Sequence, residues 1–372
     1  MNTNSTEQFP SFQSMSLLSR LLLVPQRDDT STHRMMKELT RDISTMSHEQ
    51  FDDMLRLANL NHVVMRGMPM FVEMMREIGD ESRAKWALDA QAVEQSRINN
   101  ALEFLDQICR AMHDRGIDAT IIKSLDHWPD LGSDLDLYTN ARPEDLIHFM
   151  STQFKATLAP RSWGDWLACK WNFEIPGLPE SVEVHIGRLG QTGEQSAIAA
   201  TLLQRTRHVE LAGRTFRVTS KSDRLLLSTL QRMYRHFYFR LCDILDSAGL
   251  VEKDGVDFHD LRKVATTADI WEGVATYLTI VSDYMEMYRG RGLTLPQSVM
   301  ADTRFGGESV FYARGFIRVP IMPQSARLYG TQLAGILRKR ELHNGARLSL
   351  LPWLATAAVV GQKLTGSDKG IW

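Results

Sequence analysis

The sequence predicts an α+β protein in which a small mixed β-sheet core is flanked by N- and C-terminal helical regions. Apolar residues follow helical spacing towards both ends of the chain, whereas the middle alternates apolar and polar residues in short β-branched runs. The composition, with 43% hydrophobic and 24% charged residues in a chain of 372, is that of a globular protein with a sizeable core. These changes of pattern divide the chain into a helical region at 1–112, an α+β core at 113–220 and a second helical region at 221–372.

The first region is rich in Leu, Met, Ala, Glu and Arg, which favour helices. Its apolar residues recur at three- and four-residue spacing, as in Phe51, Met54 and Leu55, and the pattern resumes through Leu102 and Leu105. We therefore expect successive helices up to about residue 112.

The character of the sequence changes after residue 116. Short alternating or β-branched runs predict strands at 119–122, 135–138, 173–175, 181–186 and 215–218. Between them, 143–154 begins with Pro143, has an acidic first turn and continues with helically spaced apolar residues, so it predicts a helix.

Helical periodicity returns after Lys221 and continues, with interruptions, to Leu364. One segment of this region, 348–361, is strongly apolar but shorter than the roughly 20 residues that a membrane-spanning helix needs. We interpret it as a buried helix. Contact with a membrane surface or a partner is the alternative.

Charge and cysteine content restrict the function classes. The 43 basic and 45 acidic side chains give a net charge of −2, which provides no overall field for holding a polyanion such as nucleic acid. The three cysteines, an odd number and far apart in sequence, argue against a disulfide framework or a zinc cluster. Since Arg20 also interrupts the apolar stretch near the N-terminus, we expect a cytoplasmic protein without a secretory signal.

The segment 121–139 carries the most informative pattern. In a strand, Asp134 and Asp136 would project from one face with Cα atoms about 6.6 Å apart, while Leu135 and Leu137 face a core. Two such carboxylates repel each other unless a cation lies between them, so the pair is a candidate site for a divalent metal. The alternative is a pair of solvent-facing carboxylates on an edge strand.

Two neighbouring features add to this pattern. Gly132 and Ser133 precede the acidic pair and would allow a tight approach turn with close access for a ligand. In the alternating run 182–186, Glu183 and His185 share a face, and a third acid on a neighbouring strand is what two-metal phosphoryl or nucleotidyl transfer requires. Glu183 as a surface acid and His185 as a packing histidine are the alternatives.

These residues resemble the signature of the nucleotidyltransferase superfamily, whose fold is that of DNA polymerase beta. In that signature a strand ending in Gly-Ser or Gly-Gly is followed by Asp-x-Asp. The chain looks most like an uncharacterised branch with the motifs Lys-Gly, Asp-Leu/Ile-Asp-Leu, acid-x-His and, on a later helix, a histidine followed by an Arg-Leu-x-Asp-like element. The corresponding residues are Lys123-Ser124, Asp134 to Leu137, Glu183 with His185, and His236 with Arg240, Leu241 and Asp243. The resemblance covers about 100–250 and is specific only at these four motifs.

The resemblance implies Mg²⁺- or Mn²⁺-dependent transfer of a nucleoside monophosphate from a nucleoside triphosphate to an acceptor hydroxyl. We expect the triphosphate to be ATP. Asp134, Asp136 and Glu183 would be the metal ligands and catalytic acids, with Glu183 also acting as base, and Lys123 and Ser124 would contact the triphosphate. The acceptor can be a small molecule, a protein or an RNA. Because Ser124 stands where the family has glycine, a catalytically degenerate nucleotide-binding or regulatory protein is the alternative, and a scaffold at a membrane surface is a third possibility.

The run 232–240 interleaves aromatic and basic side chains, which suits stacking of a nucleobase and binding of phosphates. On a continuous helix, His236, Arg240 and Asp243 would share one face, at spacings of four and seven residues. A helix with inward aromatics and solvated arginines is the alternative.

Overall fold

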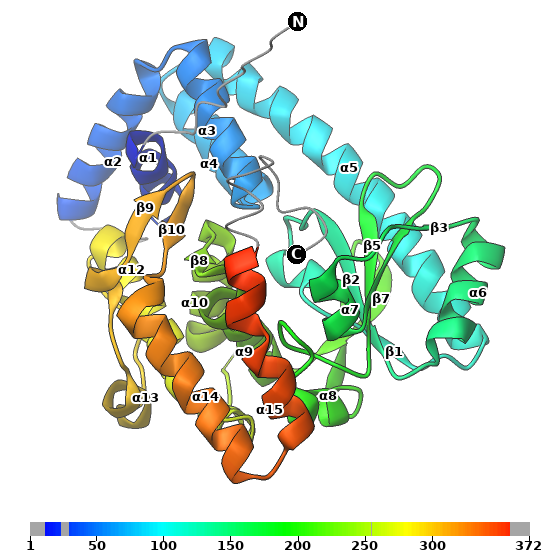
Figure 1. Ribbon diagram of the computed structural model, residues 1–372. Helices are drawn as coiled ribbons and strands as arrows, with labels where there is room; N and C mark the ends of the chain where they lie inside the picture. The colour runs from blue at the N-terminus through cyan, green and yellow to red at the C-terminus, as the bar shows by residue number, and fades with distance from the viewer. Residues whose placement is uncertain (1–11, 24–29, 254, 358–372) are drawn as a thin grey trace, which may run out of the picture.

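The computed structural model describes residues 12–23, 30–253 and 255–357. Helices come first along the chain, a seven-stranded mixed sheet with its own helices follows, and helices with a small second sheet complete it (Figure 1). The predicted α+β fold is therefore confirmed.

In the part of the chain that the structure describes, five helices precede the sheet. They are α1 (Phe12–Leu23), α2 (Thr30–Ser44), α3 (His48–Leu60), α4 (Val64–Glu77) and α5 (Glu81–Asp114). Side chains satisfy the free backbone N–H groups at two of their starts: Ser47 and Gln50 form a capping box on α3, and Asp80 caps α5. The long helix α5 runs from the other N-terminal helices to the sheet, where it packs on β1 and β7 (Figure 1).

The main sheet has the strand order β3-β4-β5-β2-β1-β7-β6. Its strands are β1 (Ala119–Ile121), β2 (Asp134–Thr139), β3 (Thr157–Leu158), β4 (Lys170–Glu174), β5 (Ser181–Ile186), β6 (Thr206–Leu211) and β7 (Arg214–Thr219). The pairs β2–β5 and β1–β7 are parallel, and the other neighbours are antiparallel. The connecting elements are the 3₁₀ turn η1 (Ser124–His127) and helices α6 (Pro143–Phe154), α7 (Trp163–Ala168) and α8 (Ser196–Leu202).

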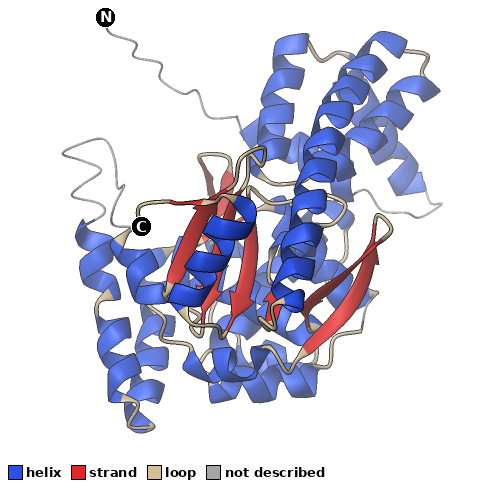
Figure 2. Ribbon diagram, turned by 90° about the vertical axis from the view of Figure 1, so that its right-hand side faces the viewer, coloured by secondary structure: helices blue, strands red, loops and turns tan. Residues whose placement is uncertain are grey.

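The two faces of this sheet differ because strand side chains alternate. Leu135 and Leu137 of β2, with Val182 and Val184 of β5, are buried in a core that they share with α5 and α6. Figure 2 shows the strands of this sheet with helices on either side. The residues between those leucines and valines, among them the acidic ones, therefore project from the opposite face.

The remaining elements follow the sheet. They are α9 (Lys221–Gln231), the π-helical turn η2 (Arg232–His236), α10 (Leu241–Glu252), α11 (Phe258–Thr267), α12 (Trp271–Arg289), α13 (Gln297–Asp302), η3 (Gly307–Ser309), η4 (Ile321–Ser325), α14 (Ala326–Arg338) and α15 (Leu342–Ser349). A three-stranded sheet of β8 (Tyr238–Phe239), β9 (Phe311–Ala313) and β10 (Phe316–Arg318) lies among them, which the sequence did not predict.

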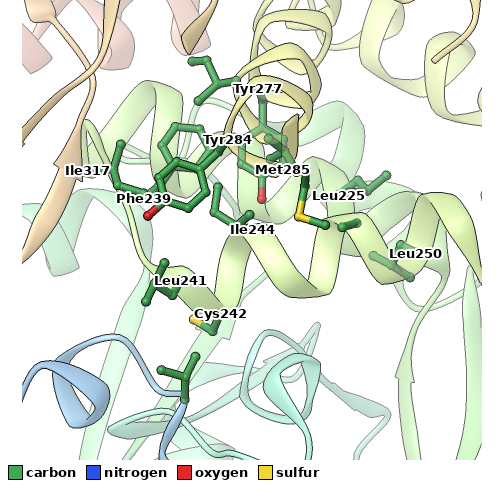
Figure 3. Packing of buried hydrophobic residues seen from close by; sticks show 14 of the residues in the cluster. Leu225, Phe239, Leu241, Cys242, Ile244, Leu250, Tyr277, Tyr284, Met285 and Ile317 are labelled. Atoms are coloured by element: carbon green, nitrogen blue, oxygen red, sulfur yellow. The ribbon is translucent and has the colours of Figure 1, made fainter. Parts of the chain in front are cut away.

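The N-terminal and C-terminal helices share one hydrophobic core. Figure 3 shows part of it, where Ile244 of α10 lies close to Phe239 and to side chains of α12. The rings of Phe239 and Tyr277 stack with centroids 5.1 Å apart. The helices before the sheet and those after it are therefore packed together in one core, which also includes Tyr138 from the face of β2 that carries the acids.

The apolar segment 348–361 was expected to be a buried helix. Residues 351–357 are helical, but most of them are exposed, Trp353 by 76% of its surface. The expectation is wrong for this part, and 358–361 lie outside the described residues. Within the described chain, the helices are all too short or too polar to cross a bilayer.

Candidate functional site

The acidic face of the sheet gathers three of the predicted residues. In the parallel pair β2–β5, Asp136 is the register partner of Glu183, and His185 follows two positions later on the same side. Ligand atoms of Asp136, Glu183 and His185 all lie within 4.8 Å of one another. The alternation of 182–186 predicts the common face of Glu183 and His185, and the pairing of β2 with β5 places that face beside Asp136.

Lys123 reaches the same carboxylates from a strained turn after β1. Its backbone has φ 60° and ψ −54°, and the N–H of Ser124 donates to the carbonyl of Ile122 at 2.6 Å, which closes a γ-turn of the rare positive-φ type. Such a conformation costs on the order of 1–3 kcal/mol in a residue with a side chain. The Lys123 ammonium forms an ion pair with Asp136 Oδ1 and lies 3.5 Å from Glu183 Oε1. The surrounding fold thus maintains a strained backbone where it directs this cation into the site.

A second lysine, which the sequence analysis missed, completes the charge balance. In the antiparallel pair β4–β5, Lys170 is the register partner of His185, and its ammonium pairs with Glu183 Oε2 and lies 3.3 Å from Asp165. The side chain is buried. Its signal was the alternation of Lys170 and Asn172 with the aromatic residues of 170–174, which places a lysine on the polar face of a strand.

The two lysines determine the ionisation of Glu183. Burial alone would raise the pKa of Glu183, but the charges of Lys170 and Lys123 and the hydrogen bond with His185 hold it well below its ordinary value. Burial alone would lower the pKa of Lys123, but the carboxylates of Asp136 and Glu183 raise it. The sequence analysis expected these acids to need a metal to offset their repulsion, and the structure offsets it with ammonium groups.

Asp134 lies at the edge of the site. It precedes Asp136 by two positions and shares its face, but it is exposed, and its carboxylate receives a hydrogen bond from Ser133 at 3.2 Å. Desolvation by the surrounding protein, and then the negative charges of Asp136 and Glu183, raise the pKa of Asp134. It is the member of the acidic group that a ligand from solvent reaches first.

Ser124 does not take the position expected for it. We expected it to contact a triphosphate where the related family exposes bare backbone, but the side chain is buried, with 2% of its surface exposed. Its Oγ accepts the N–H of Asp136 at 2.6 Å and lies 3.2 Å from the carbonyl of Asp134. The serine hydroxyl therefore fastens the γ-turn to the backbone of β2, which is a positioning role.

Gly132 is not required by its backbone. The residue has no left-handed φ, and a Cβ there would meet only Asp134 backbone atoms at ordinary contact distances of 3.8 Å or more. The turn thus does not depend on the conformational freedom of glycine, and the neighbouring Ser133 is exposed, so both residues leave the approach to the acids open as expected.

His236, Arg240 and Asp243 do not share a helical face. His236 ends the turn η2, Phe237 has a left-handed backbone, and a new helix begins only after Arg240. Asp243 is buried in an ion pair with Arg232, whose Nε lies 2.7 Å from Asp243 Oδ2. The Arg240 guanidinium instead lies 2.6 Å from His62. The prediction failed because spacing along a helix has meaning only while the helix continues.

The set of donor atoms suits a divalent cation in part. Carboxylate oxygens are the ligands that Mg²⁺ and Mn²⁺ prefer, and Asp134 and Asp136 present them on one face beside solvent. Glu183 fits less well, because Lys123 and His185 contact its Oε1 and Lys170 contacts its Oε2. The expected roles of Glu183 as third metal ligand and as base are therefore not favoured.

Comparison of the chain with protein-family models and with curated protein sequences gives no match. The resemblance to nucleotidyltransferases thus stays limited to four short motifs, and the argument for a function depends on the geometry of the site.

Proposed function

We propose that the protein is a metal-dependent nucleotidyltransferase, which moves a nucleoside monophosphate from a nucleoside triphosphate to an acceptor hydroxyl. The observation that carries this proposal is the register of β2 and β5, which sets Asp136 beside Glu183 while Lys123 reaches both from a strained turn. A reducing, cytoplasmic location belongs to the same proposal.

The residues divide the work by their surroundings. Asp134 and Asp136 would hold Mg²⁺ or Mn²⁺, which when bound neutralises phosphate charge and orients the triphosphate. Lys123 pairs with the carboxylates in the protein alone, and its ammonium can transfer that pairing to a phosphate oxygen once a metal satisfies Asp136. Lys170 and His185 keep Glu183 ionised and fixed, so Glu183 serves as the negative charge that positions Lys123.

The chemistry is a displacement at the α-phosphorus. The acceptor oxygen forms a bond to that phosphorus, the bond from phosphorus to the β-phosphate oxygen breaks, and pyrophosphate leaves. The hydroxyl proton passes to solvent, which reaches the site at the exposed Asp134. Small-molecule, protein and RNA acceptors all supply such a hydroxyl.

A second candidate is a nucleotide-binding or regulatory protein without turnover. The observation that favours it is the charge balance, because Lys123 and Lys170 neutralise the buried carboxylates without any metal. The filled position of Ser124, where the related family leaves backbone bare, favours it too. Both candidates predict nucleotide binding and differ in pyrophosphate release.

Calorimetry with Mn²⁺ and ATP tests the shared prediction. We expect the double variant Asp134→Asn, Asp136→Asn to bind MnATP at least tenfold more weakly than the parent, a loss of about 1.4 kcal/mol or more. Glu144→Gln, which removes an exposed acid from α6, is the matched control and should bind as the parent does. If the double variant binds MnATP as tightly as the parent, these aspartates are not part of the nucleotide site.

Turnover separates the two candidates. Pyrophosphate release from ATP, CTP, GTP and UTP is measured with Mg²⁺ in the presence of small polyols, bulk RNA or a denatured protein mixture. Release that disappears in Asp136→Asn supports transfer, provided that circular dichroism shows the variant to be folded. Tight MnATP binding with no release in any mixture supports the second candidate.

A further inference from the structure

Two buried polar atoms beside the carboxylate site have no hydrogen-bond partner among the described residues. They are His185 Nδ1 and Gln191 Oε1, in side chains of which only 4% and 8% of the surface is exposed. Buried polar atoms are nearly always paired, because leaving one unpaired forfeits its hydration without replacement. Two such atoms in one place indicate a partner that the protein does not itself supply.

Both residues line the same cavity, which we call the α9 cavity. It lies between the sheet and α9, is also lined by Lys123, Arg235 and leucines of α9, and has a volume of about 40 Å³. One water molecule needs roughly 10–15 Å³ on this measure, so the cavity takes about three waters or a group of similar size. Lys123 and His185 belong both to the cavity and to the carboxylate site, so the two are adjacent.

The imidazole of His185 is oriented by the carboxylate site. Its Nε2 donates to the Glu183 carboxylate, with Nε2 and Oε1 2.8 Å apart, so Nδ1 is the ring nitrogen that is left for a ligand. Glu183 thereby fixes which edge of the ring remains available for a ligand.

Gln191 is presented by a constrained loop. The Glu194 carboxylate accepts hydrogen bonds from the N–H and the hydroxyl of Thr192, at 2.9 and 3.1 Å. At Gly190, with φ +91°, a Cβ would lie 2.4 Å from Glu194 Oε1, so this close packing requires glycine. The loop therefore holds Gln191 in place before any ligand binds, as a binding site requires.

The lining selects the chemistry of the ligand. A hydroxyl group can donate to Gln191 Oε1 and can either donate to or accept from His185 Nδ1, whereas the cationic side chains of Lys123 and Arg235 disfavour an ammonium group in this cavity. We propose that the α9 cavity binds the hydroxyl-bearing end of a small polyol or sugar, whose hydroxyls form hydrogen bonds with His185 Nδ1 and Gln191 Oε1. That the bound polyol is the acceptor of the nucleotidyl group rests on the proposed function. That the α9 cavity binds a polyol does not depend on it.

Saturation-transfer NMR with glycerol, erythritol and myo-inositol, each added separately, tests the proposal. At least one of them should bind the parent, and Gln191→Leu should weaken that binding at least tenfold. Leu227→Phe should weaken the binding as well, because the larger side chain fills part of the cavity while every polar atom of the lining is kept. The second variant keeps the test decisive if Gln191→Leu fails to fold.

Gln195→Leu is the matched control, because Gln195 lies in the same loop and has a buried, unpartnered Nε2 but does not line the cavity. It should bind the polyol as the parent does. If no polyol binds the parent, or if binding survives both cavity variants, the cavity holds only water and the proposal is overturned.

Titration of the parent with MnATP in the same preparation separates this outcome from failure of the proposed function. If the parent binds MnATP but no polyol, the polyol proposal is overturned and the proposed function is not. If the parent binds a polyol but not MnATP, the proposed function is overturned and the polyol site is not.

Discussion

Replacement of Lys123 by methionine separates the two ways in which the acidic site can be neutralised. The variant keeps the length of the side chain and the γ-turn but removes the ammonium group between Asp136 and Glu183. Lys170 still pairs with Glu183, so Asp136 is the carboxylate that loses its main counter-charge. We therefore expect a destabilised protein whose stability recovers when a divalent cation is added.

The magnitude follows from burial. Only 15% of the Lys123 side chain and 12% of the Asp136 side chain are exposed, and removal of one partner from a buried pair costs about 3–5 kcal/mol. At about 2.1 cal/mol/K per residue, a chain of 372 residues has an unfolding entropy of about 0.8 kcal/mol/K. The melting temperature should thus fall by about 4–6 °C in EDTA. Mn²⁺ at a hundred times its dissociation constant would return about 2.7 kcal/mol, or about 3 °C.

Differential scanning calorimetry of the parent and of Lys123→Met, with EDTA and with Mn²⁺, measures these shifts. Lys155→Met is the matched control, since Lys155 also has a left-handed backbone, with φ 52°, but is exposed. The reasoning is refuted if Lys123→Met melts within 1 °C of the parent in EDTA. It is refuted equally if Mn²⁺ stabilises the parent as much as the variant, because the ammonium and the metal would then not share a site.

Two further pairs of variants test a buried hydrogen bond of the site and a buried ion pair. Ser124→Ala leaves the N–H of Asp136 buried without its acceptor and should cost about 1–3 kcal/mol in the free energy of unfolding measured with urea, whereas Ser133→Ala at the exposed neighbour should cost less than about 0.5 kcal/mol. Arg232→Met should lower the free energy of unfolding by about 3–5 kcal/mol, because it leaves Asp243 charged and buried. The double variant Arg232→Met, Asp243→Leu should be more stable than the single variant, and a less stable double variant would contradict this account.

The fold was predictable because its signals are local. Helical spacing predicted the N-terminal helices, and alternation predicted strands that carry leucine and valine on one face and acids on the other. The second sheet was missed because its strands span only two or three residues each, too few for an alternation to register. The break after His236 was missed for a similar reason, since a left-handed Phe237 carries no signal of the kind that glycine or proline gives.

The site was predictable only as far as one strand determines it. The spacing of Asp134 and Asp136 gives their common face, but the position of Glu183 beside Asp136 depends on pairing between strands that two helices and two further strands separate in sequence. The lysines depend on still more of the fold, Lys123 on a strained turn and Lys170 on the register of β4 against β5. Alternation puts Lys170 on the polar face of β4, but no periodicity encodes the position of either lysine beside the acids.

This difference bears on what the acids do. Taken from the sequence alone, the acids form an excess of negative charge that calls for a metal. In the fold, two ammonium groups neutralise Asp136 and Glu183, and the charge left without a counter-ion in direct contact is that of Asp134, at the solvent edge. Under the proposed function, a divalent cation held by Asp134 and Asp136 would compete with Lys123 for Asp136. A bound triphosphate would resolve this competition, because it would bring negative charge with which the displaced ammonium could pair. It follows that metal and nucleotide should each strengthen the binding of the other, so that Mn²⁺ binds more tightly with ATP present than alone, beyond the affinity that ATP itself has for the ion.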